Sequence, residues 1–420
     1  MGCGTCVGLC PQSAVRLVTD RTRGTYVSKI DEEKCNLCGI CHQVCPGNSV
    51  NFGQLNPENP DRKSNNIMIG NYDSCYIGYS NDEEIRHNST SGGLVTQLLV
   101  FALEKGIIDG VATTRMNAKR PLEPEPFIAR TREEIVSASK SKYCPVPANV
   151  VIRDILRQKG RFAVVGLPCH IQGIRKAEIL NTKLKERIIL HMGLFCSHTV
   201  SFCGTEILLE KLGIGKQDVR QLNYRGNGWP GQLSIVLSNG HQLMMKYFDY
   251  WRPLFAPFFF TPLRCLSCCD LANELADLSF GDAWLKDIMK KDKEGTSIVI
   301  SRSRIGDELL SKAKLESVIT LGRIDMELVV TSQSGALRWK KLGLRARMAL
   351  LDSFGVRTPD CGKIKNSANP FLYIIGLLQL FDAFISQNRV IRNAIGCTPF
   401  PCLRLWGTAL YYLERLSYRL

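Results

Sequence analysis

The chain has 420 residues, with 54 Lys and Arg against 39 Asp and Glu, and its formal net charge is +15. Apolar residues make up 45% and charged residues 22%, proportions that exclude a disordered chain and leave room for two or three domains. The 18 cysteines are unusual, because a chain of this length needs no disulfides to hold its core and no secretory leader is recognisable. We therefore expect a cytoplasmic protein with reduced, metal-binding cysteines.

Seven of the cysteines lie within the first 45 residues and predict a small module over residues 1–56. The second group has the spacing C-x2-C-x2-C-x3-C-P and consists of Cys35, Cys38, Cys41 and Cys45. Three thiolates on a tight loop can reach three irons of one cubane, while the fourth, beyond a turn marked by proline, reaches a second cluster. A zinc site usually needs paired CxxC or Cys/His groups. The spacing therefore predicts a [4Fe–4S] cluster.

The first group, Cys3, Cys6 and Cys10, is the same motif without its leading cysteine, which would fall just before Met1. The alternatives are a start assigned too late, a truncated chain, a non-cysteine ligand or a three-iron cluster. We favour the start assigned too late.

Residues 1–56 resemble a dicluster bacterial ferredoxin domain, in which a short strand follows each cysteine group, here Val15–Val18 and Val50–Phe52. The resemblance implies a crossed ligand pattern. One [4Fe–4S] cluster would be held by Cys10, Cys35, Cys38 and Cys41, and the other by Cys3, Cys6 and Cys45. Because such clusters carry single electrons, we expect a flavin further along the chain to exchange electron pairs for single electrons.

After a polar linker at residues 55–66, the chain alternates between helical and strand patterns over residues 67–330. A buried helix is expected at Thr96–Leu103. Strands are expected at Phe162–Val165, Ile188–Phe195 and Ser297–Ile300. This alternation predicts a mixed α/β body, so the whole chain is expected to be α+β: a small ferredoxin-like module, a larger flavin-binding body and a helical tail.

Two glycine-rich segments of the body are candidates for phosphate contacts, since backbone N–H groups at a helix start bind anions. Ser91, Gly92 and Gly93 open the predicted helix, and Gly166 and Pro168 follow a predicted strand. Ordinary helix capping by Ser91 is the competing interpretation. There is no GxGxxG motif.

A third set of cysteines, Cys169, Cys196, Cys265, Cys268 and Cys269, follows predicted strands or lies in a CxxC loop. Two strand ends and one loop can bring four thiolates to one edge of a sheet. The alternative is that these are buried structural cysteines.

The tail, residues 331–420, holds 13 Lys and Arg against 4 Asp and Glu, or +9 of the net charge. Its apolar run Phe371–Ile385 is shorter than the ~20 residues that span a bilayer and contains Asp382, so no transmembrane helix is expected. The basic, partly amphipathic tail could lie on an anionic membrane surface, pack on the body or dock an acidic partner such as a ferredoxin. Nucleic-acid binding is disfavoured, because aromatic stacking motifs are absent.

Ordered segments between residues 67 and 325 resemble the beta subunit family of coenzyme F420 hydrogenases and dehydrogenases, to which 7-hydroxymethyl chlorophyll a reductase is similar. The matching segments are TSGGL from Thr90, SKY from Ser141, VGLPCHIQGIR from Val165, GLFC from Gly193, Tyr224-Arg225, CxxCxD from Cys265 and ADLSFGDAW from Ala276. The resemblance implies FAD in the body and a third [4Fe–4S] cluster beside it. Its ligands would be Cys169, Cys196, Cys265 and Cys268. The six cysteines given only a packing role are Cys75, Cys144, Cys203, Cys361, Cys397 and Cys402.

Within the matched motifs, Lys142 and Arg175 are candidates for contacting anionic groups of FAD or substrate, with solvated surface charge as the alternative. Gln172 is a further candidate for FAD contact. His170 could tune the cluster or donate a proton, although a packed histidine is the simpler interpretation. Asp282 could hydrogen-bond the flavin, or only cap its loop. The catalytic candidates are therefore Lys142, His170 and Asp282.

These patterns predict an FAD- and [4Fe–4S]-containing oxidoreductase that exchanges hydride with coenzyme F420. It would relay single electrons to or from a partner protein, such as a ferredoxin or other subunits. Two alternatives remain: a ferredoxin-dependent flavin reductase of another organic substrate, and a non-catalytic electron-wiring subunit.

Overall fold

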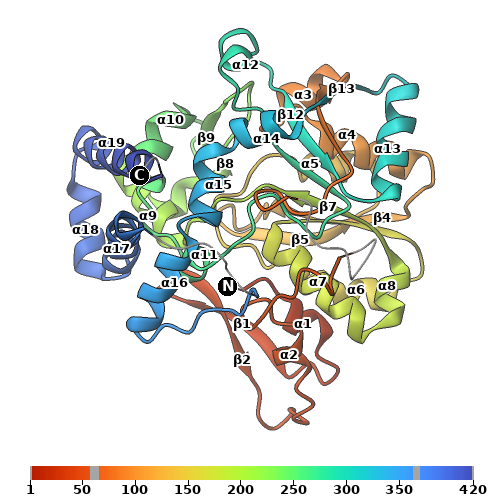
Figure 1. Ribbon diagram of the computed structural model, residues 1–420, viewed down its shortest axis with the longest axis horizontal. Coiled ribbons are helices and arrows are strands. Elements are labelled where there is room, and N and C mark those ends of the chain that lie inside the picture. Colours follow the sequence, from red (N-terminus) through yellow and green to blue (C-terminus); the bar gives the residue numbers. More distant parts are fainter. Residues whose placement is uncertain (1, 57–65, 363–368, 419–420) are drawn as a thin grey trace.

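The computed structural model describes residues 2–56, 66–362 and 369–418, and has the expected α+β architecture (Figure 1). A small N-terminal module lies against a larger mixed α/β body, and helices from the end of the chain cover one side of that body. Most of the expected linker, residues 57–65, lies outside the described residues.

The centre of the body is an eight-stranded sheet with strand order β13-β3-β12-β11-β7-β6-β4-β5. The neighbours β11, β7, β6 and β4 run parallel, and the remaining pairs are antiparallel. The strands are β3 (Ser74–Ser80), β4 (Gly110–Met116), β5 (Pro124–Ala129), β6 (Phe162–Gly166), β7 (Ile188–Leu194), β11 (Leu278–Asp282), β12 (Ser297–Ser301) and β13 (Ile319–Ile324). The three strands predicted from sequence are β6, β7 and β12.

Helices cover both faces of this sheet. Alternate residues of β6 enter two different apolar clusters, Ala163 on one face and Phe162 and Val164 on the other. One cluster joins the sheet to α4 and α13, and the other joins it to α6, α7 and α8. The body helices are α3 (Glu83–His87), α4 (Leu94–Glu104), α5 (Arg132–Ser137), α6 (Ile152–Arg157), α7 (Pro168–Leu180), α8 (Thr182–Arg187), α12 (Lys286–Lys291) and α13 (Arg304–Leu315). The predicted buried helix is α4.

The N-terminal module contains the hairpin β1 (Val15–Asp20) and β2 (Thr25–Ile30), with the short helices α1 (Thr5–Leu9) and α2 (Ile40–Gln43). The first expected strand is β1, but the prediction of a strand at Val50–Phe52 is wrong. Asn51 starts a turn there, because its side-chain oxygen accepts from the Gln54 N–H and its carbonyl from the Leu55 N–H. Val50 and Leu55 are buried in the core instead of lying on a strand.

The module is docked tightly on the body. The Asn149 side chain donates to the Thr5 hydroxyl and to the His170 carbonyl, both at 2.8 Å, and so joins α1 to α7. At Gly173 on α7, a Cβ would lie 2.2 Å from the Thr5 hydroxyl, so only glycine allows the two helices to come this close. This contact positions the cysteines of the module beside the body.

A second, antiparallel sheet has the strand order β10-β9-β8. It packs against helices rich in aromatic residues, beside the main sheet. Its strands are β8 (Val219–Asn223), β9 (Gln232–Leu237) and β10 (Gln242–Lys246). The neighbouring helices are α9 (Phe202–Lys211), α10 (Tyr247–Tyr250), a π-helix (Trp251–Phe255) and α11 (Leu263–Leu266).

The expected helical tail is present, and much of it packs on the body. Its helices are α14 (Met326–Ser332), α15 (Ser334–Lys341), α16 (Leu344–Ser353), α17 (Pro370–Ile385), α18 (Arg389–Cys397) and α19 (Phe400–Ser417). Trp339, Leu351 and Leu410 share one apolar cluster with Phe258 and Leu266 of the body. Among the described residues, no single helix is long and apolar enough to cross a membrane. The pair α17 and α18, bent by 99°, passes this test only when taken together.

Candidate active site

A cavity of about 640 Å³ opens at the carboxyl ends of three adjacent parallel strands, β6, β7 and β11. Gly166 ends β6, Leu194 ends β7 and Asp282 ends β11, and all three residues line the cavity. Ligands of open α/β sheets bind at this edge, and the volume lies within the range of roughly 300–1,000 Å³ for small-molecule sites. We therefore identify the cavity as the candidate active site.

Aromatic side chains supply much of the cavity wall. They include Tyr143, Tyr247, Phe248, Trp251 and Trp284. The ring centroids of Tyr143 and Trp251 are 4.6 Å apart, and Tyr247 stacks on Trp251 at 5.4 Å with the planes inclined by 25°. Flat aromatic surfaces make large contacts with planar rings. This wall therefore suits a flat heterocyclic ligand.

A buried ion pair between Arg225 and Asp282 stands beside this wall. The Arg225 guanidinium donates to both oxygens of the Asp282 carboxylate, at 2.9 and 3.2 Å, and to the Thr90 carbonyl at 2.7 Å. Its carbon lies 4.5 Å from the Tyr247 ring centroid. Burial opposes the charge, but Asp282 raises the Arg225 pKa well above its ordinary value. Asp282 thus holds a permanent cation at the cavity wall.

Lys142 lines the cavity, and its ammonium donates to the carbonyls of Ala138, Ser139 and Lys140 at 2.5, 2.8 and 2.9 Å. The side chain is therefore not a solvated surface charge. Burial lowers the pKa of Lys142 to about 7, so Nζ can hold or release a proton near neutral pH.

His170 also lines the cavity, but both of its ring nitrogens are in use. Nδ1 accepts from the Leu167 N–H at 3.1 Å, and Nε2 lies 3.0 Å from the Val146 carbonyl, to which it donates. Burial lowers the pKa of His170 to about 4, so the ring is neutral. His170 is therefore a packed histidine that fixes the turn into α7.

The glycine-rich segment Ser91–Gly93 lies at the cavity, with Ser91 and Gly93 in its wall. Ser91 does not cap α4. Its hydroxyl lies 2.8 Å from that of Ser297, which also accepts from the Gly92 N–H at 2.9 Å. The N-cap of α4 is Gly93 itself, with a positive φ of 74° that favours glycine. These contacts with Ser297 join the Ser91–Gly93 segment to strand β12 at the edge of the cavity.

Four of the expected cofactor-binding residues are not in the cavity wall. They are Gly92, Pro168, Gln172 and Arg175. Pro168 is the first residue of α7, and Gln172 donates to the buried Asp270 carboxylate at 3.1 Å. Both residues are buried in α7 and act in packing within the body.

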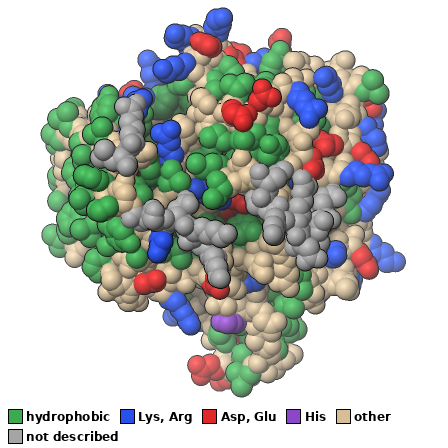
Figure 2. Space-filling model, viewed as in Figure 1, with side chains coloured by type: hydrophobic (Ala, Val, Ile, Leu, Met, Phe, Trp, Pro, Cys, Tyr) green, Lys and Arg blue, Asp and Glu red, His purple; other side chains and the backbone are tan. Residues whose placement is uncertain are grey.

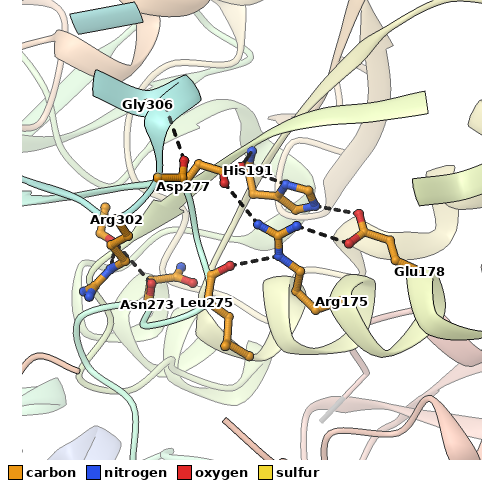
Figure 3. A network of polar contacts seen from close by, with 10 residues as sticks. Arg175, Glu178, His191, Asn273, Leu275, Asp277, Arg302 and Gly306 are labelled. Atoms are coloured by element: carbon orange, nitrogen blue, oxygen red, sulfur yellow. Dashed lines mark hydrogen bonds and ion pairs between the residues drawn. The ribbon is translucent and has the colours of Figure 1, made fainter. Parts of the chain in front are cut away.

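Arg175 belongs to a buried network with Glu178, His191 and Asp277 (Figure 3). Its guanidinium donates to Asp277 at 3.2 Å, to Glu178 at 3.3 Å and to the Leu275 carbonyl at 3.0 Å. His191 lies between the two carboxylates, with Nε2 2.7 Å from Glu178 and Nδ1 3.0 Å from Asp277. Arg175 is therefore neither a solvated surface charge nor a cavity residue.

The four body cysteines expected to bind a cluster are brought together beside the cavity. Burial raises the pKa of Cys169 well above its ordinary value, and the nearby thiolates of Cys196, Cys265 and Cys268 raise it further. Burial raises the pKa of Cys196 to about 12, and Cys196 also lines the cavity. Four buried thiols this close together resist ionisation, because their thiolates would repel one another. A positively charged metal centre would remove this obstacle, so the set suits metal binding.

The module cysteines show the same pattern. Burial raises the pKa of Cys6 to about 12, and Cys3, Cys45 and Cys41 raise it further. Cys41 and Cys45 of the second group thus lie near Cys6 of the first. Cys3 also acts on Cys169 of the body. The cysteines of the module and the four cysteines of the body therefore lie next to each other.

No group of three or more His, Cys, Asp or Glu side chains in residues 2–56, 66–362 and 369–418 is arranged around a single metal ion. A cubane is bound differently, since each cysteine ligates a different iron and the sulfurs lie further apart. The two neighbouring sets of free thiols thus fit cubanes better than one-ion sites.

Sequence reasoning missed several residues of the cavity wall, including Tyr247, Trp251, His198, Gln333 and Tyr411. The aromatic density of the run Tyr247–Trp251 was an available signal. No pattern marked Gln333 or Tyr411, because they come from the tail and reach the cavity only through the fold.

Family models match most of the chain. The model described as "Coenzyme F420 hydrogenase/dehydrogenase, beta subunit N-term" matches residues 75–153, and the model for the carboxyl-terminal part of the same beta subunit matches residues 159–327. A 4Fe-4S dicluster domain matches residues 1–49. The coenzyme F420 hydrogenase subunit beta of Methanothermobacter thermautotrophicus is 30% identical over 254 residues, covering 59% of this chain and 83% of that one.

The chain belongs to the coenzyme F420 hydrogenase/dehydrogenase beta subunit family. One subunit of the F(420)H(2) dehydrogenase of Methanosarcina mazei is 24% identical, covering 76% of this chain and 83% of that one. A solved chain of the F420-reducing [NiFe] hydrogenase complex from Methanosarcina barkeri has the same fold. Its TM-score is 0.53 at 23% identity, over 72% of this chain and 98% of that chain.

This membership confirms the predicted family, the dicluster module and the oxidoreductase class. The F420 beta subunit family models end at residue 327, so helices α15 to α19 lie beyond the matched region.

Proposed function

We propose that this F420 hydrogenase/dehydrogenase beta subunit-like protein binds FAD in the cavity, exchanges hydride with coenzyme F420, and relays single electrons through its [4Fe–4S] clusters to or from a partner. One observation carries the proposal: the cavity has an aromatic wall and shares Cys196 with the body cysteine set. When bound, FAD would supply the conversion between electron pairs and single electrons.

The residues of the chain would act by binding and orientation. The aromatic wall would hold planar rings, and Arg225, kept charged by Asp282, would face the developing negative charge of a bound ring. Lys142 Nζ would exchange a proton at the cavity edge. Cys169, Cys196, Cys265 and Cys268 would hold the body cluster.

The partner would meet the ferredoxin module. The proposed relay runs from the cavity to the body cluster and then to the module, because Cys3 adjoins Cys169. The relatives named above belong to an F420-reducing hydrogenase and an F420H2 dehydrogenase. We therefore propose that the partner is another subunit of an electron-transfer complex or a ferredoxin.

Anaerobic purification tests this proposal directly. We expect stoichiometric FAD, bleaching of its absorbance by reduced F420, and F420H2 oxidation with a viologen as electron acceptor. Flavin that is reduced by ferredoxin but not by F420H2 would favour the F420-independent alternative. A preparation without flavin would contradict the FAD site.

We also propose that the tail rests on an anionic membrane surface from the cytoplasmic side. Exposed apolar side chains recur on one face of α17 and of α19, and Figure 2 shows apolar side chains gathered over α17–α19. Those more than half exposed on α17 and α19 are Phe371, Ile374, Phe381, Leu405, Tyr411, Tyr412 and Leu416. The excess of +9 in residues 331–420 complements anionic lipid, whereas a neutral surface would gain nothing from it.

Sedimentation with vesicles tests the membrane proposal. The full chain should sediment with vesicles rich in phosphatidylglycerol but not with phosphatidylcholine vesicles, and Phe381→Ser with Leu405→Ser should reduce sedimentation several-fold. Equal sedimentation with both lipids, or none with either, would contradict the proposal. The apolar face of α17 and α19 would then be expected to bind a partner protein.

A further inference from the structure

Lys340 is an almost completely buried lysine at the end of α15, with 1% of its surface exposed. It comes from the tail, beyond the region matched by the family models. Burial lowers the pKa of its ammonium, but the thiols of Cys268, Cys196 and Cys265 raise it, Cys268 also as a hydrogen-bond partner. The ammonium also lies 4.9 Å from the Trp339 ring centroid. Trp339 packs with Leu266, which lies within the Cys265–Cys268 loop, so Lys340 lies beside the body set.

Within the described residues, no carboxylate balances this charge. In the described part of the chain, no ion pair joins Lys340 to an Asp or Glu, whereas the adjacent Lys341 pairs with Glu274. Arg347, the other cation buried nearby, donates to the carbonyls of Leu266 and Trp339. A buried ammonium without a counter-ion costs several kcal/mol. The compensating negative charge is thus expected from the cysteine set itself.

A cubane bound by four thiolates supplies that charge. It is an anion, and reduction makes it more negative. A fixed positive charge stabilises the reduced form more than the oxidised form, and a hydrogen bond to a ligand sulfur acts in the same direction. Lys340 can supply both the positive charge and the hydrogen bond.

We infer that Lys340 is a positioning residue that raises the reduction potential of the body cluster. The inference rests on the proposed function, because it requires a [4Fe–4S] cluster on the four body cysteines. The body set lies between the cavity, through Cys196, and the module, through Cys169 and Cys3. The tail would thereby set how readily electrons pass between the cavity and the ferredoxin module.

The test compares variants of the full, anaerobically purified holoprotein by redox titration followed by electron paramagnetic resonance. Lys340→Met removes the charge and the hydrogen bond at similar length, and Lys340→Gln keeps a hydrogen-bond donor without the charge. Arg338→Met is the matched control, because it removes a partly exposed cation from the same helix. The signal that disappears in Cys265→Ser identifies the body cluster.

We expect the body-cluster potential to move to more negative values in Lys340→Met, and by less in Lys340→Gln. The module clusters and Arg338→Met should keep wild-type potentials. If Lys340→Met loses iron, a lowered potential in Lys340→Gln still supports the inference. A wild-type potential in Lys340→Gln, or in Lys340→Met with full iron content, would overturn it. A wild-type protein whose spectrum is unchanged by Cys265→Ser would instead refute the body cluster of the proposed function.

Discussion

Lys142 and His170 both line the cavity and both lose charge through burial, but their surroundings differ. His170 is held neutral by two backbone partners and has no nitrogen left for a ligand. The ammonium of Lys142 donates to three backbone carbonyls. Its pKa of about 7 allows it to gain or lose a proton near neutral pH. Of the three catalytic candidates, Lys142 is the one whose pKa lies near 7.

Lys142→Met should slow F420H2 oxidation by about 100-fold or more, because a positioned acid–base group contributes about 10²–10⁴-fold. The wild-type rate should change across pH 7, since the amine is protonated below this pH and neutral above it. The variant should lack this inflection. Lys119→Met, which removes an exposed lysine outside the cavity wall, is the control, and a Lys142→Met profile that matches it would contradict the acid–base role.

The network of Arg175, Glu178, His191 and Asp277 contributes to stability. Burial opposes the charges of Glu178 and Asp277, but His191 and Arg175 outweigh it and lower both carboxyl pKa values. Burial and Arg175 also oppose a charged His191, but the two carboxylates raise its pKa. The stability from the carboxylates is present above pH ~4 and is lost as pH falls below it. The stability from His191 is present below pH ~6.5 and is lost as pH rises through its raised pKa.

Asp277→Asn should lower the free energy of unfolding by about 3–5 kcal/mol, because it leaves buried cations with one anion fewer. Urea unfolding at neutral pH measures this. Asp287→Asn on exposed α12 should change stability by no more than about 0.5 kcal/mol. Equal effects of the two substitutions would show that the network is not a stabilising unit.

At the scale of elements, strong apolar patterns predicted α4, β6, β7 and β12, and the resemblance to a ferredoxin predicted β1. The predicted strand after the second cysteine group was wrong, because the side chain of Asn51 forms a turn that no apolar pattern reveals. Phe371–Ile385 forms α17, as its continuous apolar run indicates. The run could not show which face α17 buries, since that depends on α16 and α19 packed against it.

Helices α17 and α19 share a buried polar contact that predicts a pH dependence. Trp406 Nε1 donates to Asp382 at 2.9 Å, and burial raises the pKa of Asp382 to about 7. The folded state therefore favours the protonated carboxyl, and stability is lost as pH rises from ~4 through 7.

Asp382→Asn keeps an acceptor for Trp406 but cannot ionise. Its stability advantage over the wild type should grow by about 1–3 kcal/mol between about pH 4 and about pH 8. Chemical unfolding of both proteins across this range tests the prediction. Parallel stability profiles would mean that Asp382 titrates in the fold as it does in water.

At the scale of the whole molecule, three parts of the chain meet at the body cysteines. The module contributes Cys3, the body contributes the four thiols and the wall of the cavity, and the tail contributes Lys340. The Val50 N–H donates to the Asp360 carbonyl at 2.8 Å, so the tail segment after α16 also holds the module. Electron flow through the molecule is thus expected to depend on all three parts.

The anaerobic protein should contain about eight to twelve irons, from two or three cubanes. Cys38→Ser should abolish electron transfer from the module to a partner, yet leave flavin reduction by substrate largely intact. Iron analysis and stopped-flow absorbance measure the two outcomes. Four irons or fewer would count against the dicluster module, and loss of both activities together would show that the module is needed for folding.

The amino-acid sequence alone was enough to predict the cysteine groups, the alternating body and the family, because these depend on local spacing and on order along the chain. It also placed Ser91, Gly93, Lys142, Gly166 and Asp282 among the candidates that line the cavity. The folded chain was needed to show that Arg175 stabilises the core, that Asp282 holds Arg225, and that a tail lysine faces the body cysteines. Burial and charge partners set these roles, and both arise from residues far apart in sequence.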